Sequence, residues 1–269
     1  MIKYYFIKVL FLLSVLKGFS QDKLKEGFTN PPTDARPKGL WDWVNGNYSY
    51  SQIKYELREC KDKGMGGLDI WDVGTINNPV AGPPFLSDHS ADAIAFTIRE
   101  AKQLDLEIGL ISSSSWNAGG TWVKPEDGIF GIYKSDTIIV GGQVSLIKLP
   151  KPVIPVLKQD YKVKKISEAP KIYKTVYSIA YNQNDNKLID ISKSVGDDGS
   201  VNWQVPSGKW KIEWYVAIST NQNLVIPSEN SIGLMLDHFS EKAQRNNLDY
   251  IFSRLTERLG KELGNTALK

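Results

Sequence analysis

The sequence lacks the residue patterns on which several enzyme classes depend. It has one cysteine, Cys60, and two histidines among its 269 residues, and a single thiol cannot form an internal disulfide. It contains no His-x-x-x-His pair, no glycine-rich phosphate loop after a predicted strand and no Gly-x-Ser-x-Gly motif. Zinc hydrolases, nucleotide-binding enzymes and serine esterases therefore find no support in the sequence.

A large charge of either sign is also missing. The formal net charge is +3, and the first 20 residues contain three lysines and no acidic residue. Without those residues the chain has 30 basic and 30 acidic side chains, so the pI of 8.7 does not indicate a nucleic-acid partner. With 41% hydrophobic and 23% charged residues, the composition is that of a globular protein.

The first 20 residues have the pattern of a secretory signal peptide. A basic start precedes a mostly apolar run at residues 9–16, and the small residues Gly18 and Ser20 occupy the positions that a signal peptidase reads. We expect cleavage before Gln21 and an exported protein, periplasmic or extracellular, with no membrane contact after signal removal. The alternative is an N-terminal membrane anchor, but the run is well short of the roughly 20 apolar residues that span a bilayer.

Residues 21–130 alternate between the patterns of strands and helices. The predicted strands are residues 40–45, 67–73 and 106–111. Amphipathic helices, which start near Ser49 and Ser90, separate these strands. The alternation predicts βαβ units with a parallel sheet, in which the loops after the strands gather at one edge.

Residues 131–225 follow a different pattern, which predicts an inserted all-β, sandwich-like module. Short apolar runs are separated by turns such as Gly141-Gly142 and 197–200, and residues 210–218 alternate between apolar and polar side chains. The earlier pattern returns in residues 226–269, with an apolar run at 232–236 and a helix that starts after Ser240.

These patterns together predict an α/β fold, the first part of a TIM-like (β/α)8 barrel that the β-module interrupts. A complete barrel typically takes about 250 residues without insertions, whereas only four βα units fit in this chain. We therefore expect the chain to be the amino-terminal part of a longer protein. The alternative is a short protein with a rearranged fold.

Six polar or aromatic residues lie where the predicted strands end. They are Trp43, Asn45, Asp72, Trp116, Asn117 and Asp237. In a βα-barrel the functional groups come from the strand ends, and aromatic rings beside Asp and Asn side chains can stack on a sugar ring and hydrogen-bond to its hydroxyl groups. These residues predict an oligo- or polysaccharide ligand.

Each candidate also has a structural interpretation. Trp41 and Trp43 alternate in one strand, so at least one of them is expected in the core. Asp69 and Asp72 lie on opposite faces of a strand, so one of them is expected to be a helix cap or a surface acid. A carboxylate such as Asp237 after an apolar strand requires either exposure or a partner.

Four motifs, in this order along the chain, resemble glycoside hydrolase family 106, the α-L-rhamnosidases. They are Asn30-Pro31-Pro32-x-x-Ala35-Arg36-Pro37-x-x-x-Trp41-x-Trp43-x-Asn45-Gly46, Gly64-Met65-Gly66-Gly67-Leu68, the loop from Ser115 to Glu126, and Asp237-His238-Phe239-Ser240-x-x-Ala243. The resemblance implies a large exported enzyme with a (β/α)8 barrel and β-domains. Such enzymes cleave terminal α-linked rhamnose from plant-type glycans with inversion, and they require calcium.

The resemblance also implies what this chain does not supply. The family's catalytic glutamates come from later barrel strands, so no catalytic residue and no calcium ligand can be assigned here. We expect the chain alone to be inactive and the six candidates to form part of the floor of the cleft. The rival hypotheses are a non-catalytic exported carbohydrate-binding protein and another glycosidase specificity on the same scaffold. The sequence does not indicate an oligomeric state.

Overall fold

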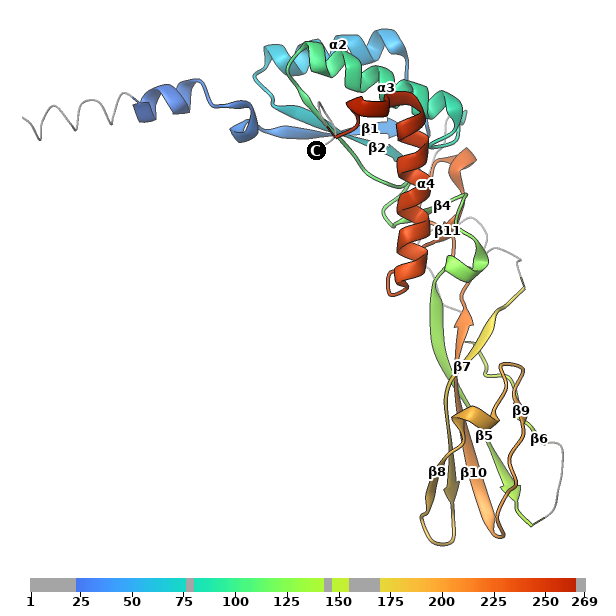
Figure 1. Cartoon of the computed structure of the whole chain (residues 1–269). Coiled ribbons are helices and arrows are strands. Elements are labelled where there is room, and N and C mark those ends of the chain that lie inside the picture. The colour runs from blue at the N-terminus through green and yellow to red at the C-terminus, as the bar shows by residue number, and fades with distance from the viewer. Residues whose placement is uncertain (1–22, 76–79, 143–146, 155–169, 265–269) are drawn as a thin grey trace, which may run out of the picture.

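The structure, a computed structural model, describes residues 23–75, 80–142, 147–154 and 170–264. Its α-helices are α2 (Tyr50–Asp62), α3 (Asp88–Gln103) and α4 (Glu241–Leu259). Its strands are β1 (Lys38–Val44), β2 (Gly67–Val73), β3 (Glu107–Leu110), β4 (Gly119–Gly120), β5 (Phe130–Val140), β6 (Ile147–Lys148), β7 (Tyr173–Asn182), β8 (Leu188–Asp190), β9 (Ser200–Val201), β10 (Lys209–Ser219) and β11 (Leu234–Met235). Figure 1 shows a helix-covered sheet from which a long β-module, strands β5 to β10, extends.

The first three strands form a parallel sheet in the order β1-β2-β3. β1 pairs with β2 along its whole length, and Gly67 of β2 is opposite Glu107 of β3. α2 and α3 lie between successive strands in the sequence. The predicted alternation of parallel strands and helices in this part of the chain is therefore confirmed.

The helices begin at serine caps. The Ser49 hydroxyl accepts a hydrogen bond from the backbone of Gln52 at the start of α2, which satisfies one of the free N–H groups of the first turn. The sequence predicts that α3 starts near Ser90; the helix starts at Asp88, and its cap is Ser87. Ser90 lies three residues later, and its hydroxyl accepts from the backbone of Leu86, so both serines serve the same helix start.

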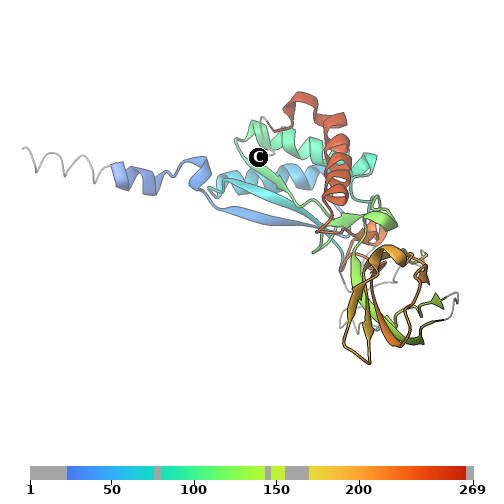
Figure 2. The same ribbon diagram turned by 60° about the horizontal axis from the view of Figure 1, so that its bottom comes forward.

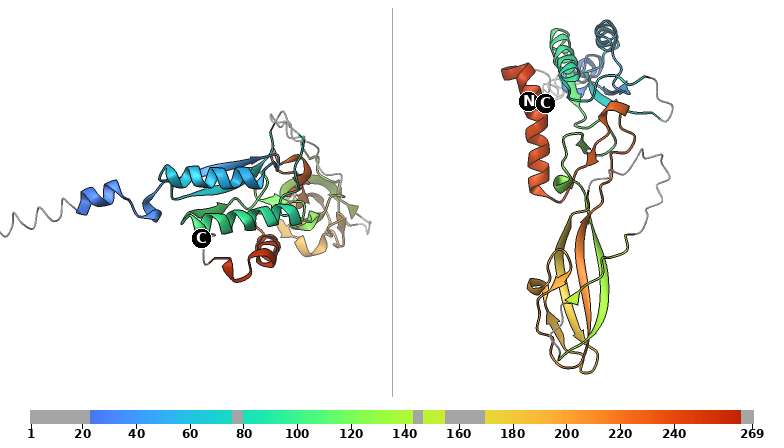
Figure 3. Two further views of the ribbon diagram at one scale, coloured as in Figure 1. Left: turned by 90° about the horizontal axis from the view of Figure 1, so that it is seen from above. Right: turned by 90° about the vertical axis from the view of Figure 1, so that its right-hand side faces the viewer.

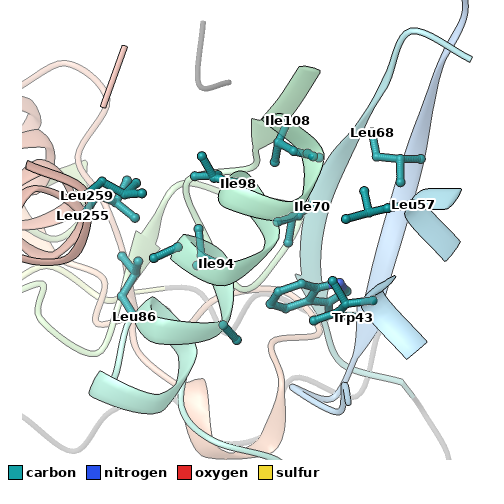
Figure 4. Packing of buried hydrophobic residues seen from close by; sticks show 14 of the residues in the cluster. Trp43, Leu57, Leu68, Ile70, Leu86, Ile94, Ile98, Ile108, Leu255 and Leu259 are labelled. Atoms are coloured by element: carbon teal, nitrogen blue, oxygen red, sulfur yellow. The ribbon is translucent and has the colours of Figure 1, made fainter. Parts of the chain in front are cut away.

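The main core lies between the parallel sheet and the helices (Figure 4). It contains Leu57 of α2, Ile70 of β2, Ile94 and Ile98 of α3, Ile108 of β3, and Leu255 and Leu259 of α4. The other face of the sheet carries Leu40 and Asp42, which are exposed. Helices α2, α3 and α4 thus pack against one face of the sheet.

α4 extends the helical layer. Figure 3 shows α2, α3 and α4 side by side when the molecule is seen from above. Arg254 and Arg258 of α4 form ion pairs with Asp88 at the start of α3, and these arginines hold the pKa of Asp88 below its usual value. The ion pairs fix the amino-terminal end of α3 against α4.

The β-module is an antiparallel sheet in the order β5-β10-β7-β8 with a separate pair, β6 and β9. The inner face of β10 carries Trp210, Ile212, Trp214, Val216 and Ile218, all buried. Leu149 and Val201, beside or within the β6–β9 pair, pack into the same cluster. Figure 2 shows the module at the end of the molecule opposite residues 23–29, which are also helical.

The predicted strand at residues 232–236 differs from the expectation of a fourth parallel strand. β11 pairs antiparallel with β4, and this pair is separate from the β1-β2-β3 sheet. Glycine makes this close pairing feasible, because a Cβ on Gly233 would lie 2.1 Å from the backbone of Gly120. Among the described residues, no helix is long and apolar enough to cross a membrane.

Candidate functional site

Polar side chains from three strand ends meet at the carboxyl edge of the parallel sheet. Asn45 follows β1, Asp72 lies near the end of β2, and the loop of residues 112–117 follows β3. Residues 225–229, which lie between the β-module and β11, hydrogen-bond to all three. We call Asn45, Asp72, Ser114, Asn117 and Ser228 the strand-end cluster.

Asp72 is the buried carboxyl group of this cluster. Its side chain is 2% exposed, and its Oδ1 atom accepts hydrogen bonds from the hydroxyl groups of Ser114 and Ser228. Burial raises the pKa of Asp72 to about 6, although the two hydroxyl donors act in the opposite direction. The carboxyl group therefore connects the loop after β3 to residues 225–229 at a cost in desolvation.

The two aspartates of β2 lie on opposite faces of the strand, as predicted. Asp72 shares the helix-facing side with the core residues Leu68 and Ile70. Asp69 lies on the open face, where the neighbouring position of β3 is Gly109. A Cβ on Gly109 would be 2.0 Å from the Asp69 Oδ1 atom, so glycine provides the space that this carboxylate occupies.

Asn45 anchors the same segment from the end of β1. It is fully buried, its φ of 56° lies in the left-handed region, and its Oδ1 atom accepts a hydrogen bond of 2.7 Å from the backbone of Glu229. Asparagine tolerates this backbone conformation better than most residues. Asparagine therefore fits the backbone conformation at this strand end, and its side-chain amide anchors residues 225–229.

Residues 225–229 are held on both sides. The backbone of Val225 donates to the Asn117 Oδ1 atom at 3.3 Å, and the carbonyl of Ile226 accepts from Gly74 at 3.0 Å. Ile226 has a φ of 53°, which is strained for a β-branched residue. Strain of this kind persists where surrounding contacts fix the backbone, and it is common in binding and catalytic sites.

Trp116 is the exposed aromatic residue at this edge. Its ring is 66% exposed and meets Trp71 edge to face, with centroids 4.4 Å apart and an interplanar angle of 89°. Trp71 donates a hydrogen bond of 3.0 Å from its Nε1 atom to the carbonyl of Ser115. The loop and Trp71 together hold the Trp116 ring where a ligand can reach it.

Trp43 has a packing position. It is 3% exposed and contacts Trp41 edge to face at 5.8 Å and Tyr48 at 4.6 Å between centroids. Figure 4 shows it beside the sheet among the other core side chains. The sequence analysis expects at least one of these two tryptophans in the core. Trp43 is that core residue, so it is not part of the strand-end cluster.

Asp237 lies outside the strand-end cluster. It is half-buried after β11, and its Oδ1 atom accepts a hydrogen bond of 3.0 Å from the backbone of Phe239. Its backbone N–H bonds to the carbonyl of Asp127. In this position Asp237 organises the turn that leads into α4.

The described residues contain no group of three or more His, Cys, Asp or Glu side chains that could hold a metal ion. Asp72 has two serine hydroxyl groups as neighbours, which is not the multiple-carboxylate donor set that calcium prefers. The strand-end cluster does not fit a calcium ion.

Three residues that build this site are not among the six candidates predicted from the sequence. Trp71 orients Trp116, while Ser114 and Ser228 hold Asp72. Trp71 and Ser114 do lie at the strand ends where the sequence predicts functional groups. Ser228 carries no sequence signal, since 156 residues separate it from its partner Asp72.

Parallel βα units define an α/β protein, and the Asp, Asn and Trp side chains at its strand ends form a candidate ligand site at the carboxyl edge of the sheet. The sequence profile of glycoside hydrolase family 106, described as alpha-L-rhamnosidase, matches residues 29–187 and 171–269. The chain belongs to this family of glycoside hydrolases.

Two known proteins are similar to this chain over most of its length. A protein of Formosa agariphila, provisionally named a beta-glucuronidase, is 27% identical over 268 residues, which cover 88% of this chain and 23% of the relative. The solved structure of a rhamnosidase from Novosphingobium sp. PP1Y matches with a TM-score of 0.70 at 17% identity, over 91% of this chain and 39% of that chain. The chain thus spans less than half the length of either protein.

Proposed function

We propose that this chain forms part of the catalytic barrel of an exported glycoside hydrolase that removes a terminal α-linked L-rhamnose from plant-type glycans with inversion. The observation that carries the proposal is the strand-end cluster, with the exposed Trp116 beside it, in a chain of family 106. β1, β2 and β3 are then the first barrel strands. The β-module interrupts the barrel after them, and the open face of the sheet, with Leu40, Asp42 and Asp69, faces the barrel interior.

In this proposal the described residues bind and position sugar. Trp116 offers an aromatic surface to the apolar face of a sugar ring. Asp72 acts as a positioning residue, because Ser114 and Ser228 occupy its Oδ1 atom and it is almost fully buried. Asn45 and Asn117 fix the segment 225–229 that borders the site.

The acid and base are not among these residues. Inverting hydrolysis uses two carboxyl groups that lie roughly 6.5–9.5 Å apart, and Asp72 is enclosed by its serine partners. We therefore propose that the 269-residue chain alone does not hydrolyse glycosides, and that any required calcium has ligands other than the strand-end cluster.

The test uses the protein expressed from the complete reading frame that contains these residues. We expect release of the aryl group from an aryl α-L-rhamnoside, with the β-anomer of rhamnose as the first product by NMR, and loss of activity in EDTA that calcium restores. The 269-residue chain is the comparison and is expected to be inactive. No release from the rhamnoside by the complete protein would refute the proposal.

Two alternative functions are tested in the same experiment. An aryl β-D-glucuronide tests the specificity suggested by the name of the Formosa agariphila relative. Binding of polysaccharide without hydrolysis by the complete protein would favour the carbohydrate-binding hypothesis.

A variant tests the role of Trp116. Trp116→Ala should lower kcat/KM for the aryl rhamnoside on the order of tenfold, chiefly through KM, because a stacking contact of about 1.4 kcal/mol corresponds to a factor of ten. Phe252→Ala is the matched control, since Phe252 is an exposed aromatic residue of α4. Equal effects of the two variants would contradict a binding role for Trp116.

A further inference from the structure

The outer face of the β-module exposes a group of apolar side chains. The strands of the sheet alternate, so one face is buried in the module core while the other carries Ile132, Val176, Tyr177 and Leu188. Val176 is 51% exposed and Leu188 61%. Contiguous exposed apolar groups on a soluble protein mark a surface that binds something.

Two tyrosines form a cross-strand pair on this face, next to a β-bulge. Tyr215 of β10 is opposite Tyr177 of β7, whereas the next residue, Val216, is opposite Thr175, so Val176 is the extra residue. As a result, Val176 and Tyr177 are both exposed, and the rings of Tyr177 and Tyr215 lie 6.4 Å apart at an angle of 42°. Bulges of this kind redirect side chains and are frequent near functional sites.

The two tyrosines line a hollow of about 730 Å³. This volume lies within the roughly 300–1,000 Å³ of small-molecule sites. Its lining comprises Ile132, Val176, Tyr177, Ile179, Tyr181, Leu188, Lys211, Glu213 and Tyr215. We call this lining the tyrosine face.

Hydrogen bonds hold two of the three tyrosine rings in place. The Tyr215 hydroxyl donates to the Glu213 Oε2 atom at 3.0 Å, and the Tyr181 hydroxyl donates to the side chain of Asn186. Rings that are fixed before binding lose little conformational entropy when a ligand arrives. The tyrosine face is therefore prepared for a ligand that stacks on aromatic rings.

The charges beside these rings cancel. The Lys211 ammonium lies 3.0 Å from Glu213 and 3.6 Å from Asp136, and Lys134 lies 3.3 Å from Glu213. Two lysines thus face two acidic residues. A ligand of high charge gains nothing from such a surface, whereas hydroxyl groups can bond to both its donors and its acceptors.

We propose that the tyrosine face binds an uncharged stretch of a polysaccharide, with sugar rings stacked on Tyr177 and Tyr215 and their hydroxyl groups directed toward Lys211 and Glu213. A sugar ring suits this surface because it has an apolar C–H face and a hydroxylated edge. The inference rests on the proposed function for the class of ligand, a glycan. It adds a binding surface on the β-module.

Affinity electrophoresis tests the proposal on the protein expressed from the complete reading frame that contains these residues. Native gels contain dissolved rhamnan, galactomannan, xyloglucan or arabinogalactan, with polygalacturonate as the charged comparison. We expect at least one of the first four to retard the chain, and more strongly than polygalacturonate does. Tyr177→Ala and Tyr215→Ala should each weaken the apparent affinity on the order of tenfold.

Three variants serve as controls. Tyr177→Phe keeps the aromatic ring and should retain binding. Tyr55→Ala removes an exposed tyrosine from α2, and Ile138→Ala removes an exposed side chain from the same outer face outside the hollow; neither should change the retardation. The thermal unfolding of each variant shows whether it is folded.

Several results would overturn the inference. These are no retardation in any of the neutral gels, an equal loss in Ile138→Ala, or a dimer in light scattering that Tyr177→Ala dissociates. Its failure differs from that of the proposed function, because retardation requires no hydrolysis. Tyrosine-dependent retardation of the complete protein, together with no glycoside cleavage by that same protein, would support the tyrosine face and refute the enzymatic proposal.

Discussion

The helix-covered sheet and the β-module place polar and apolar side chains in opposite ways. At the carboxyl edge of the parallel sheet, Asp72 and Asn45 are buried and hydrogen-bonded to distant loops. On the outer face of the β-module, Val176 and Leu188 are exposed. Buried polar groups therefore fix the position of loops in the first region, while exposed apolar groups offer a surface in the second.

The largest expected effect is on the inner face of the β-module. Trp214 is fully buried, and its Nε1 atom donates to the Thr175 hydroxyl at 3.0 Å. Trp214→Ala should lower the free energy of unfolding of the module by about 3–5 kcal/mol, because it leaves a cavity in the core. Urea denaturation measures this loss.

Trp116→Ala is the control for that variant in the other region. Because the Trp116 ring is largely exposed, its removal should change the free energy of unfolding by less than about 1 kcal/mol. A similar loss in both variants would contradict the assignment of Trp214 to the core and Trp116 to the surface.

The second prediction concerns the pH dependence that Asp72 causes. Burial raises its pKa from 3.8 to about 6, so the folded protein binds a proton more tightly than the unfolded chain does. The stability from this group is fully present below about pH 4 and is lost as the pH rises through 6. Asp72→Asn keeps the shape and removes the titration.

The measurement compares the two proteins at each pH. Between about pH 4 and pH 7, the difference in free energy of unfolding should shift by about 2–3 kcal/mol in favour of Asp72→Asn. The serine hydroxyl groups can rotate to bond with the amide. A constant difference over this pH range would show that Asp72 has an ordinary pKa and is not desolvated.

At Asn45, two variants separate the contribution of the side-chain hydrogen bond to stability from that of the backbone conformation. Asn45→Gly removes the acceptor for the backbone of Glu229 but suits the positive φ, whereas Asn45→Ala removes the acceptor and strains the backbone. We expect losses in free energy of unfolding of about 1 kcal/mol for glycine and about 2 kcal/mol for alanine. Equal losses in thermal denaturation would mean that the conformation at this position does not matter.

The smallest effect should come from a carboxylate of the β-module. Lys211, with Tyr215 and Lys134, holds the pKa of Glu213 below its usual value of 4.5. Its stabilisation is therefore present above that value and is lost as the pH falls, the reverse of Asp72. Glu213→Gln should cost about 0.5 kcal/mol near pH 7 and nothing in acid; a loss that grows as the pH falls would contradict this sign.

Local pattern in the sequence determined the elements of the first region. The apolar periods around Ile53 and Leu57, the cap at Ser49 and the runs at 67–73 and 106–111 led to helices and strands that the structure confirms. The alternation of residues 210–218 likewise identified the buried face of β10. These features depend on neighbours a few residues apart, so the sequence alone suffices to predict them.

The candidate site could be predicted only as a location. Asn45, Asp72 and Asn117 do meet residues 225–229 at one edge of the sheet, but that segment follows the β-module, and no local signal relates Ser228 to Asp72. Local sequence patterns also do not show that Trp43 is buried in the core while Trp116 is exposed.

Pairing between distant segments decided the rest. The apolar run at 232–236 suits a parallel or an antiparallel strand equally well; in the structure it pairs antiparallel with β4, whose glycines allow the close contact. The pairing of Tyr177 with Tyr215 and the adjacent bulge at Val176 likewise depend on the register between β7 and β10. The sequence by itself determined which segments form helices and strands, because local periodicity carries that information, whereas only the tertiary structure decided which side chains are buried together.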